Sequence, residues 1–412
     1  MKILWVKFGK LIPVDAGGKI RSYNILRHLS SRHHVALLSC YGGKRDQVYE
    51  RELRKHFAHA FFTCNGAPED SDGILANGLH YFLRLASLVP YAVSKFTSKE
   101  ARRIVREKLD GREFDVAVCD FLAVSDNFPK LLNTPTVLFQ HNVEASLWQR
   151  QAQCEQNYLK KVIFKLEAAK MKRYESAAIR KFHHVIAVSE GDKRLMSRAA
   201  AENISVVPTG VNLGEFCDAS SSGPPGNVVM FTGSMDWEAN VDAMLYFCSK
   251  IWPEVRSAVP DAKFFIVGRN PDPIVKKLAS DSVEVTGTVP SVIEYLKAAA
   301  VFVVPLRIGG GTRLKIFEAM AMGKAIVSTN IGAEGLEVQD GRDILLCEEP
   351  SDFANRIIQV LRDKDLRERL GRAAANTASK YDWSVVAPRF ENVLASVADV
   401  PGRGACYHHS KR

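Results

Sequence analysis

One run of residues combines glycines, positive charge and a carboxylate. It lies between a short apolar segment and an Ala- and Met-rich one, and its residues are Gly309, Gly310, Gly311, Thr312, Arg313, Lys315 and Glu318. Glycines at the start of a helix let peptide N–H groups approach an anion closely, and the two cations add attraction for a phosphate. Further along the helix, the carboxylate of Glu318 can accept hydrogen bonds from a vicinal diol such as a ribose. Phosphate and ribose together predict a nucleotide site.

A structural explanation of the same run needs no ligand. The glycines would then form only a tight turn, Arg313 and Lys315 would be solvated, and Glu318 would pair with one of them. A carboxylate within an otherwise apolar helix favours the nucleotide site over this alternative. Neither common nucleotide motif fits, because a dinucleotide fingerprint belongs after the first strand of a βαβ unit and no Gly-Lys-Ser/Thr closes a P-loop.

The elements that must position these residues follow from the hydrophobic pattern, in which short β-branched runs alternate with longer amphipathic ones. Such alternation predicts an α/β fold with parallel sheets covered by helices. A Gly-, Ser- and Pro-rich stretch divides the chain, and its composition is that of a linker. We expect doubly wound domains at residues 1–213 and 227–380, a linker at 214–226, a helix at 381–400 that crosses back to the first domain, and a frayed tail at 401–412.

Other polar or glycine residues also follow predicted strands. Ligands of open parallel sheets bind beyond the carboxyl ends of the strands, so these positions are candidates for a site. Because they occur in both halves of the chain, they predict a cleft between two domains. The residues are Gly17 and Gly18 after "KILWVKF", His141 after "TVLFQ", Gly233 and Ser234 at the end of "NVVMFTG", and Arg269 after "AKFFIVG".

Each of these positions has a structural alternative. The glycines can simply form turns, and His141 can be an N-cap or a core histidine. Ser234 and Asn240 can cap the next helix, which is the commoner use of such residues. Arg269 can be an ordinary surface cation.

Composition limits the class of protein. The 412 residues, 46% hydrophobic and 25% charged, are typical of a globular protein with a large core. Eight widely spaced cysteines show no ligand pattern, which predicts reduced thiols and a cytoplasmic compartment. No apolar run reaches the roughly 18 residues of a membrane span, and the N-terminal run is too short and too basic for a signal peptide.

The net charge of +10 favours an anionic partner. Nucleic acid is disfavoured because no basic stripe is interleaved with exposed aromatics and no nucleic-acid-binding signature occurs. No metal site is expected either, since the Asp-x-Asp sequences at residues 70–72 and 363–365 are interpreted as solvated surface. Between Glu155 and His184, eight Lys or Arg accompany three Glu. This pattern fits a basic amphipathic helix on an anionic membrane, or a solvated helix face.

A series of segments occurs in order along the chain: "GGKIRSYNILRHL", "HNVE", "VIAVSEGDKRLM", "ISVVPTGVN", "FTGSMDWEANVDAM", "PLRIGGGTRLKIFEAMAMGKAIVSTNIGAEGL" and "YDW". Through these segments the sequence resembles, over almost its whole length, the family 4, or group 1, glycosyltransferases of the GT-B fold. Within that family it is similar to bacterial sugar transferases associated with exosortase and exopolysaccharide loci.

The resemblance implies two Rossmann-like domains facing a cleft, with a nucleoside-diphosphate sugar of UDP or GDP type bound by the second and a glycan or lipid-linked acceptor by the first. Transfer would retain the anomeric configuration without a metal or other cofactor. Glu318 would hold the ribose, and His141 would orient the transferred sugar or the acceptor hydroxyl. Gly17 and Gly18 would open the acceptor loop. Gly233, Ser234, Arg269 and the residues of the glycine run would contact the donor.

The chain departs from the family pattern in two places. A glutamate that usually contacts the donor sugar would fall at Gly310, and the usual Arg and Lys after the first strand of the donor domain are replaced by "GSMDWEAN". We therefore expect Arg313 and Lys315 to neutralise the pyrophosphate. The departure at Gly310 also motivates an alternative, a nucleotide-sugar-binding or scaffold protein without turnover. An NAD-dependent oxidoreductase is disfavoured because the first strand lacks the dinucleotide fingerprint.

Overall fold

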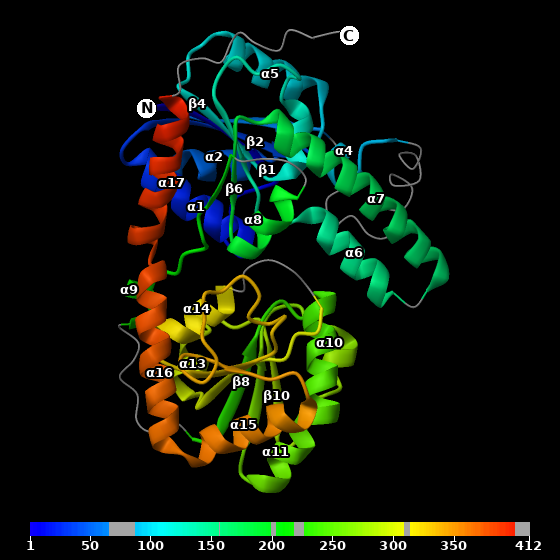
Figure 1. Ribbon diagram of the computed structural model, residues 1–412, viewed down its shortest axis with the longest axis vertical. Coiled ribbons are helices and arrows are strands. Elements are labelled where there is room, and N and C mark those ends of the chain that lie inside the picture. Colours follow the sequence, from blue (N-terminus) through cyan, green and yellow to red (C-terminus); the bar gives the residue numbers. More distant parts are fainter. Residues whose placement is uncertain (66–86, 156, 199–202, 218–225, 309–313, 400–412) are drawn as a thin grey trace. The chain divides into compact units, whose positions relative to one another are not determined.

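A computed structural model of the chain describes residues 1–65, 87–155, 157–198, 203–217, 226–308 and 314–399. It divides into two compact units, one formed by Met1–Pro208 with Ala387–Arg412 and the other by Thr209–Val386. Each unit contains one parallel sheet flanked by helices (Figure 1). The predicted α/β fold with two parallel-sheet units is therefore confirmed. Among the helices of the described residues, none is both long and apolar enough to cross a membrane.

The first unit has a seven-stranded sheet in the order β3-β2-β1-β4-β5-β6-β7. Apolar residues fill these strands almost without interruption, which is typical of parallel strands buried on both faces. Because β1 pairs with both β2 and β4, the direction of winding reverses between β1 and β4. The strands are β1 Lys2–Phe8, β2 His34–Tyr41, β3 Ala60–Cys64, β4 Val116–Asp120, β5 Thr136–Phe139, β6 His184–Ala187 and β7 Ile204–Val206.

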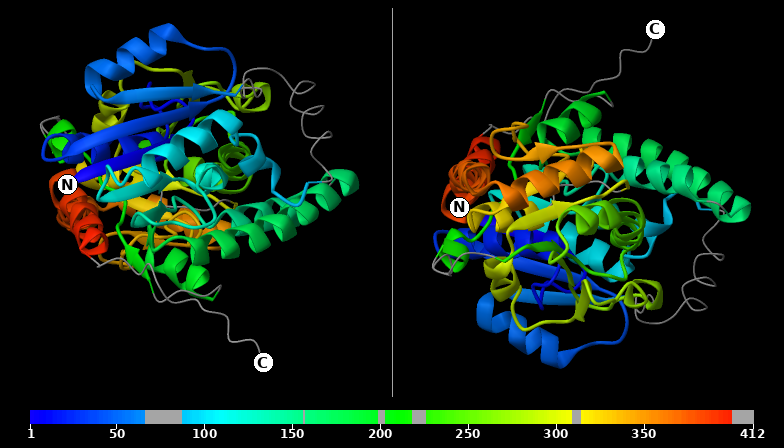
Figure 2. Two further views of the ribbon diagram at one scale, coloured as in Figure 1. Left: turned by 90° about the horizontal axis from the view of Figure 1, so that it is seen from above. Right: turned by 90° about the horizontal axis from the view of Figure 1, so that it is seen from below.

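Helices cover both faces of this sheet (Figures 1 and 2). One face packs on α5 and α7 through residues such as Val105 and Met171. On the other face, the ring of Phe390 in α17 contacts Trp5 and Phe139, with centroids 5.6 and 4.8 Å apart. The helices are α1 Gly17–Ser30, α2 Gln47–His56, α4 Tyr91–Ser94, α5 Lys99–Asp110, the 3₁₀ helix η2 Leu122–Asn127, α6 Glu144–Cys154, α7 Tyr158–Lys181, α8 Glu190–Ser197 and α17 Trp383–Ala398.

The second unit has a six-stranded parallel sheet in the order β10-β9-β8-β11-β12-β13. Its winding reverses between β8 and β11, in the same way as between β1 and β4 of the first unit. The strands are β8 Val228–Thr232, β9 Lys263–Val267, β10 Val283–Gly287, β11 Val301–Val304, β12 Ala325–Ser328 and β13 Leu345–Leu346.

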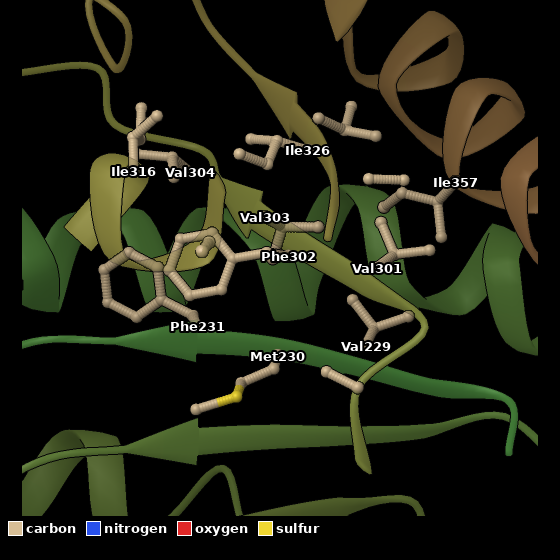
Figure 3. Close-up of a cluster of buried hydrophobic side chains, with 14 of the residues drawn as sticks. Val229, Met230, Phe231, Val301, Phe302, Val303, Val304, Ile316, Ile326 and Ile357 are labelled. Atoms are coloured by element: carbon tan, nitrogen blue, oxygen red, sulfur yellow. The ribbon is translucent and has the colours of Figure 1, made fainter. Parts of the chain in front are cut away.

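Helices of the second unit close the core around these strands. Figure 3 shows side chains of β8, β11 and β12, among them Phe231, Phe302 and Ile326, gathered with Ile316 of α14 and Ile357 of α15. The helices are α9 Leu213–Cys217, α10 Glu238–Tyr246, the π-helix η3 Phe247–Ile251, α11 Trp252–Ala258, α12 Pro273–Lys276, α13 Ile293–Ala298, α14 Leu314–Ala321, α15 Pro350–Arg362, α16 Lys364–Ala378 and the 3₁₀ helix η4 Ser379–Tyr381.

The boundary between the units differs from the predicted one at residue 213. Val211 belongs to the second unit, because its N–H donates to the carbonyl of Tyr381 at 2.8 Å. The predicted linker at 214–226 begins inside α9, where Phe216 is buried against the core of the second unit. Residues 218–225 of that linker and the predicted tail at 401–412 lie outside the described residues.

Candidate active site

His141 lies just beyond the end of β5 and is buried in the first unit. Its Nδ1 is 2.9 Å from Nη1 of Arg21, and its Nε2 is 2.8 Å from Oδ1 of Asp120. A guanidinium only donates hydrogen bonds, so Nδ1 must accept and Nε2 must carry the proton that is donated to Asp120. Burial lowers the pKa of His141 to about 3, against the opposing effect of Asp120. The imidazole is therefore neutral, with both nitrogens engaged.

Asp120 ends β4 beside the point where the winding of the sheet reverses, and it connects several buried groups. It accepts a hydrogen bond from Nε1 of Trp5 at 2.9 Å, and Nζ of Lys7 lies 3.7 Å from it. Burial alone would raise the pKa of Asp120, but Lys7 and the bond from His141 lower it below the ordinary value. Asp120 is thus a charged acceptor that fixes the orientation of His141.

Phe121 follows Asp120 with a φ of 77°, a conformation that bulky residues rarely adopt. Its ring stacks on the imidazole of His141, with centroids 3.7 Å apart and planes inclined by 10°. Nζ of Lys7 lies 4.4 Å from the centre of the same ring. Strained backbone of this kind persists only where surrounding contacts hold it, and it concentrates at functional sites.

Gly18, in the first turn of α1, lies against this stack. A Cβ atom at residue 18 would be 2.5 Å from Cζ of Phe121 and 3.6 Å from Nδ1 of His141. The N-cap residue Ala16 gives the helix no side-chain cap. The structure thus brings Gly18 to His141, and the close approach requires glycine at residue 18, so Gly18 is more than a plain turn residue. Gly17 is the first residue of α1, and no contact of it with His141 is observed.

In the second unit, Gly233 follows β8 beside the other winding reversal. A Cβ atom there would be 2.7 Å from Nδ2 of Asn240 and 2.9 Å from Nζ of Lys315. The same Nζ donates to Oδ1 of Asn240 at 3.2 Å and lies 3.9 Å from the centre of the Phe231 ring. Lys315 of α14 therefore brings its charge to the end of the first strand of this unit.

Ser234 and Arg269 tie the loops after β8 and β9 together. Nε of Arg269 donates to Oγ of Ser234 at 3.1 Å, and Ser234 donates to Oδ1 of Asp236 at 2.5 Å. The two backbones touch, since a Cβ atom at Gly268 would be 1.7 Å from the carbonyl oxygen of Gly233.

The alternative that Ser234 or Asn240 caps the next helix is wrong. The helix α10 begins after Trp237 and has no side-chain cap, while Nδ2 of Asn240 donates to the carbonyl of Ser234 at 2.8 Å. Both residues instead shape the loop that follows β8.

Glu318 lies within α14, four residues after its first residue, Leu314. Burial raises the pKa of its carboxyl group to about 7, with a lowering effect from Lys315 and a raising effect from Glu215. No hydrogen bond or ion pair joins this carboxylate to another described side chain, so the structural alternative in which Glu318 pairs with Lys315 is not observed, whereas Arg313 lies outside the described residues. A carboxylate that is desolvated but not paired by its neighbours is typical of a ligand site.

The remaining predicted site residues lie outside the described part of the chain, in the sequence between β11 and α14: Gly309, Gly310, Gly311, Thr312 and Arg313. No group of three or more His, Cys, Asp and Glu side chains that could hold a metal ion occurs in the described part of the chain.

Three residues of the first site were missed from the sequence: Arg21, Asp120 and Phe121. Asp120 ends a strand, as the other candidates do, so the rule that found His141 could also have found it. Nothing in the sequence marks Arg21, which comes from α1 and reaches His141 only through the strand order.

Comparison with protein families matches both units. A family described as glycosyltransferase family 4 matches residues 16–215, and one described as glycosyl transferases group 1 matches residues 226–363. Phosphatidyl-myo-inositol mannosyltransferase of Mycobacterium leprae is 29% identical over 223 residues, which are 52% of this chain and 59% of that protein. The chain thus spans about three fifths of the length of such curated relatives. An uncharacterized protein in the cps region of Klebsiella pneumoniae is 22% identical over 92% of this chain and 96% of its own length.

Solved structures show the same fold. HepE of Anabaena, in a complex with UDP and glucose, has a TM-score of 0.66 at 16% identity and covers 96% of this chain and 100% of its own. Sucrose-phosphate synthase of Thermosynechococcus elongatus has a TM-score of 0.70 at 17% identity, covering 96% and 99%. The two units, each with a strand order that reverses beside its first strand, have the GT-B architecture. With both of its units matched, the chain belongs to the group 1, family 4 glycosyltransferases.

Proposed function

We propose that the chain is a glycosyltransferase that moves a sugar from a nucleoside-diphosphate sugar, of UDP or GDP type, to a glycan or lipid-linked acceptor. Exopolysaccharide or other surface-glycan assembly at the cytoplasmic face of a membrane is the proposed setting. The observation that carries the proposal is the position of Lys315 and Glu318 on one helix. The cation lies at Gly233, beside the strand end where parallel sheets bind ligands. One turn away lies a carboxylate that has no hydrogen-bond or ion-pair partner among the described side chains.

The chemistry of this arrangement suits a diphosphate leaving group. Nζ of Lys315 would stabilise the negative charge that develops on the phosphate as the glycosidic bond breaks, and Arg313 would act with it. Glu318 would accept hydrogen bonds from the ribose hydroxyls, because a carboxylate offers acceptors only. The proposed mechanism uses no metal, because Arg313 and Lys315 would neutralise the charge of the diphosphate.

The proposed role of His141 is positioning. Its two ring nitrogens are already bonded to Arg21 and Asp120, so it takes up no proton without breaking one of these bonds. The neutral ring, locked by Phe121, would present a fixed surface near Gly18 to the transferred sugar or to the acceptor. In the proposed step the bond from the anomeric carbon to the diphosphate breaks, and the acceptor oxygen bonds to that carbon from the same face. The acceptor proton would pass to the departing phosphate, and the sugar would retain its configuration without a covalent intermediate on the protein.

The first experiment is a thermal-shift panel with UDP-, GDP- and ADP-sugars, since a ligand that binds only the folded protein raises its apparent stability. The sugar donor that shifts the transition is then incubated with the protein and with candidate glycan and lipid acceptors, with and without EDTA. We expect release of the nucleoside diphosphate that EDTA does not abolish, and a product with the anomeric configuration of the donor by NMR. Binding without consumption of any donor would favour the scaffold protein instead.

A double variant tests the proposed phosphate contacts. Arg313→Ala with Lys315→Ala should weaken donor binding strongly, whereas Lys276→Ala, an exposed lysine of α12 in the same unit, should leave it unchanged. Unchanged donor affinity in the double variant would contradict the proposed site.

A further inference from the structure

The helix α7 exposes four large apolar side chains near its N-terminus. Tyr158 is 79% exposed, Leu159 74%, Val162 38% and Leu166 50%. Successive residues of a helix are rotated by about 100°, so these four positions lie on one side of α7. Single exposed apolar residues are common on protein surfaces, but a continuous set on one helix side marks an interaction site. We refer to these four residues as the apolar face.

Cations adjoin the apolar face of α7. Lys165 and Lys172 lie on its flank toward the neighbouring helix α6, and Arg173 continues the apolar side two turns beyond Leu166. Lys165, Lys172 and Arg173 are exposed, and none of them forms an ion pair with a described residue. The helix contains only two acidic residues, Glu167 and Glu175, and both are buried. The exposed surface of α7 is therefore apolar near the N-terminus of the helix, with positive charge on its flank and toward its C-terminus.

Both buried acids serve the structure of the first unit. Glu167 accepts from the N–H of Tyr91 at 2.9 Å and pairs with Lys170 at 3.0 Å. Glu175 accepts from the N–H groups of Glu144 and Ala145 and so caps α6. Their burial removes negative charge from the helix surface, which leaves that surface complementary to an anionic layer.

The inner side of α7 already has its partner. The helices α6 and α7 lie side by side and extend together away from the sheet of the first unit (Figures 1 and 2). Phe164 contacts Trp148 across the pair, with ring centroids 5.8 Å apart. Between the helices is a hollow of about 510 Å³ whose charged lining residues are Lys161, Lys165 and Lys172. The apolar face is thus not needed for the core of the unit.

We propose that the apolar face of α7 inserts into the headgroup region of an anionic lipid bilayer, with Lys165, Lys172 and Arg173 against the lipid phosphates. Helices of this kind lie in the plane of the interface and bury their apolar side by about 5–10 Å. Each cation near an anionic surface strengthens such binding. The inference deepens the proposed function by naming the surface that would meet a membrane carrying a lipid-linked acceptor, but it does not depend on sugar transfer.

The test is co-sedimentation of the full chain with vesicles of phosphatidylcholine alone or with added phosphatidylglycerol. Wild-type protein should bind the anionic vesicles and lose binding as salt rises. Leu159→Ser with Leu166→Ser should reduce the partition coefficient at least about tenfold, because two apolar side chains no longer leave water. Lys165→Gln with Lys172→Gln should reduce it by about fivefold for each charge removed at low salt. The matched control is Leu131→Ser, which changes a leucine that is 84% exposed elsewhere in the same unit.

Equal binding of all variants, or binding to neutral and anionic vesicles alike, would overturn the inference. A wild-type dimer that the leucine double variant converts to a monomer, with no vesicle binding by either, would assign the face to a second copy of the chain and also overturn it. Circular dichroism and the nucleotide-induced thermal shift should be unchanged in every variant, since these side chains lie on the surface of the first unit. Vesicle binding without donor consumption would support the membrane surface while contradicting the proposed transferase.

Discussion

Replacing Glu318 by glutamine should stabilise the free protein and weaken its binding of the donor. Burial raises the pKa of this carboxyl group from 4.5 to about 7, so the folded protein bears a cost whenever the group is ionised. The full shift corresponds to about 3 kcal/mol, and solvent access to the partly exposed side chain reduces this to about 2 kcal/mol. Glutamine has nearly the same shape and no charge to desolvate.

The sign of the pH dependence follows from the raised pKa. The group contributes stability that is fully present below the unfolded pKa of about 4.5 and is lost as the pH rises through about 7. The variant should therefore match the wild type near pH 4 and exceed it near pH 8. For a unit of this size, about 2 kcal/mol raises the melting temperature by roughly 4–8 °C.

Donor binding should change in the opposite direction. A hydrogen bond from a ribose hydroxyl to a carboxylate is worth about 1.5–3 kcal/mol, and one to a neutral amide about 0.5–1.5 kcal/mol. The variant should thus bind the donor roughly fivefold to twentyfold more weakly near pH 8. In the wild type, affinity should fall as the pH drops below 7, because the carboxyl group must release its proton to accept both bonds.

Calorimetric titrations with a nucleotide sugar between pH 5.5 and 8 measure this dependence. A nucleotide sugar is preferable to the free diphosphate, because its esterified phosphates do not titrate near neutral pH. Thermal melts of both proteins without ligand give the stability change. A variant that is less stable than the wild type at pH 8, or that keeps full affinity and the same pH dependence, would refute the assignment of Glu318 to the ribose.

Three further changes test other parts of the two sites. Lys315→Met should weaken donor binding at least about tenfold by removing a charge-assisted contact, whereas Lys250→Met, a lysine of η3 in the same unit, should not; calorimetry compares them. Gly18→Ala should lower transfer activity at least about tenfold by pushing Phe121 off His141, while Gly214→Ala, where a Cβ meets only an Asn212 oxygen at 3.7 Å, should be neutral in the same assay. Arg21→Met should raise the pKa of His141, because Arg21 is one of the cations that lower it. NMR titration of the imidazole measures this pKa, and a value that stayed at about 3 would contradict the expectation.

Most strands of the two sheets could be predicted from the sequence, because parallel strands that are buried on both faces form continuous apolar runs. The strand β3, Ala60–Cys64, was not predicted, since it lies at the edge of its sheet and two of its residues, Phe61 and Phe62, are only half-buried. The boundary near residue 213 was misplaced because Val211 pairs with a segment 170 residues away.

The positions of residues in the sequence predicted candidate site residues but not the side chains that these residues contact. His141 and Gly18 were each expected at a strand end, yet their contact depends on β1, β4 and β5 being neighbours in the sheet. The hydrogen bonds of His141 to Arg21 and Asp120 depend on the same strand order. They determine the tautomer of His141, which cannot be predicted from a local sequence pattern. Glu318 was predicted to be a ligand residue, and only the fold shows that no described side chain pairs with its carboxylate. The roles of all these residues stay predictions until the experiments above are done.

The last long helix has a consequence for how the chain matures during synthesis. Phe390 fills the contact with Trp5 and Phe139, and the carboxylate of Glu391 bonds His28 and His33 at 2.7 and 2.8 Å. These groups complete the packing of strands and helices that are synthesised hundreds of residues earlier. The first unit therefore completes its fold only after α17 has been synthesised. A gene fragment that stops at residue 208 should thus yield a product prone to aggregation rather than a separate folding unit.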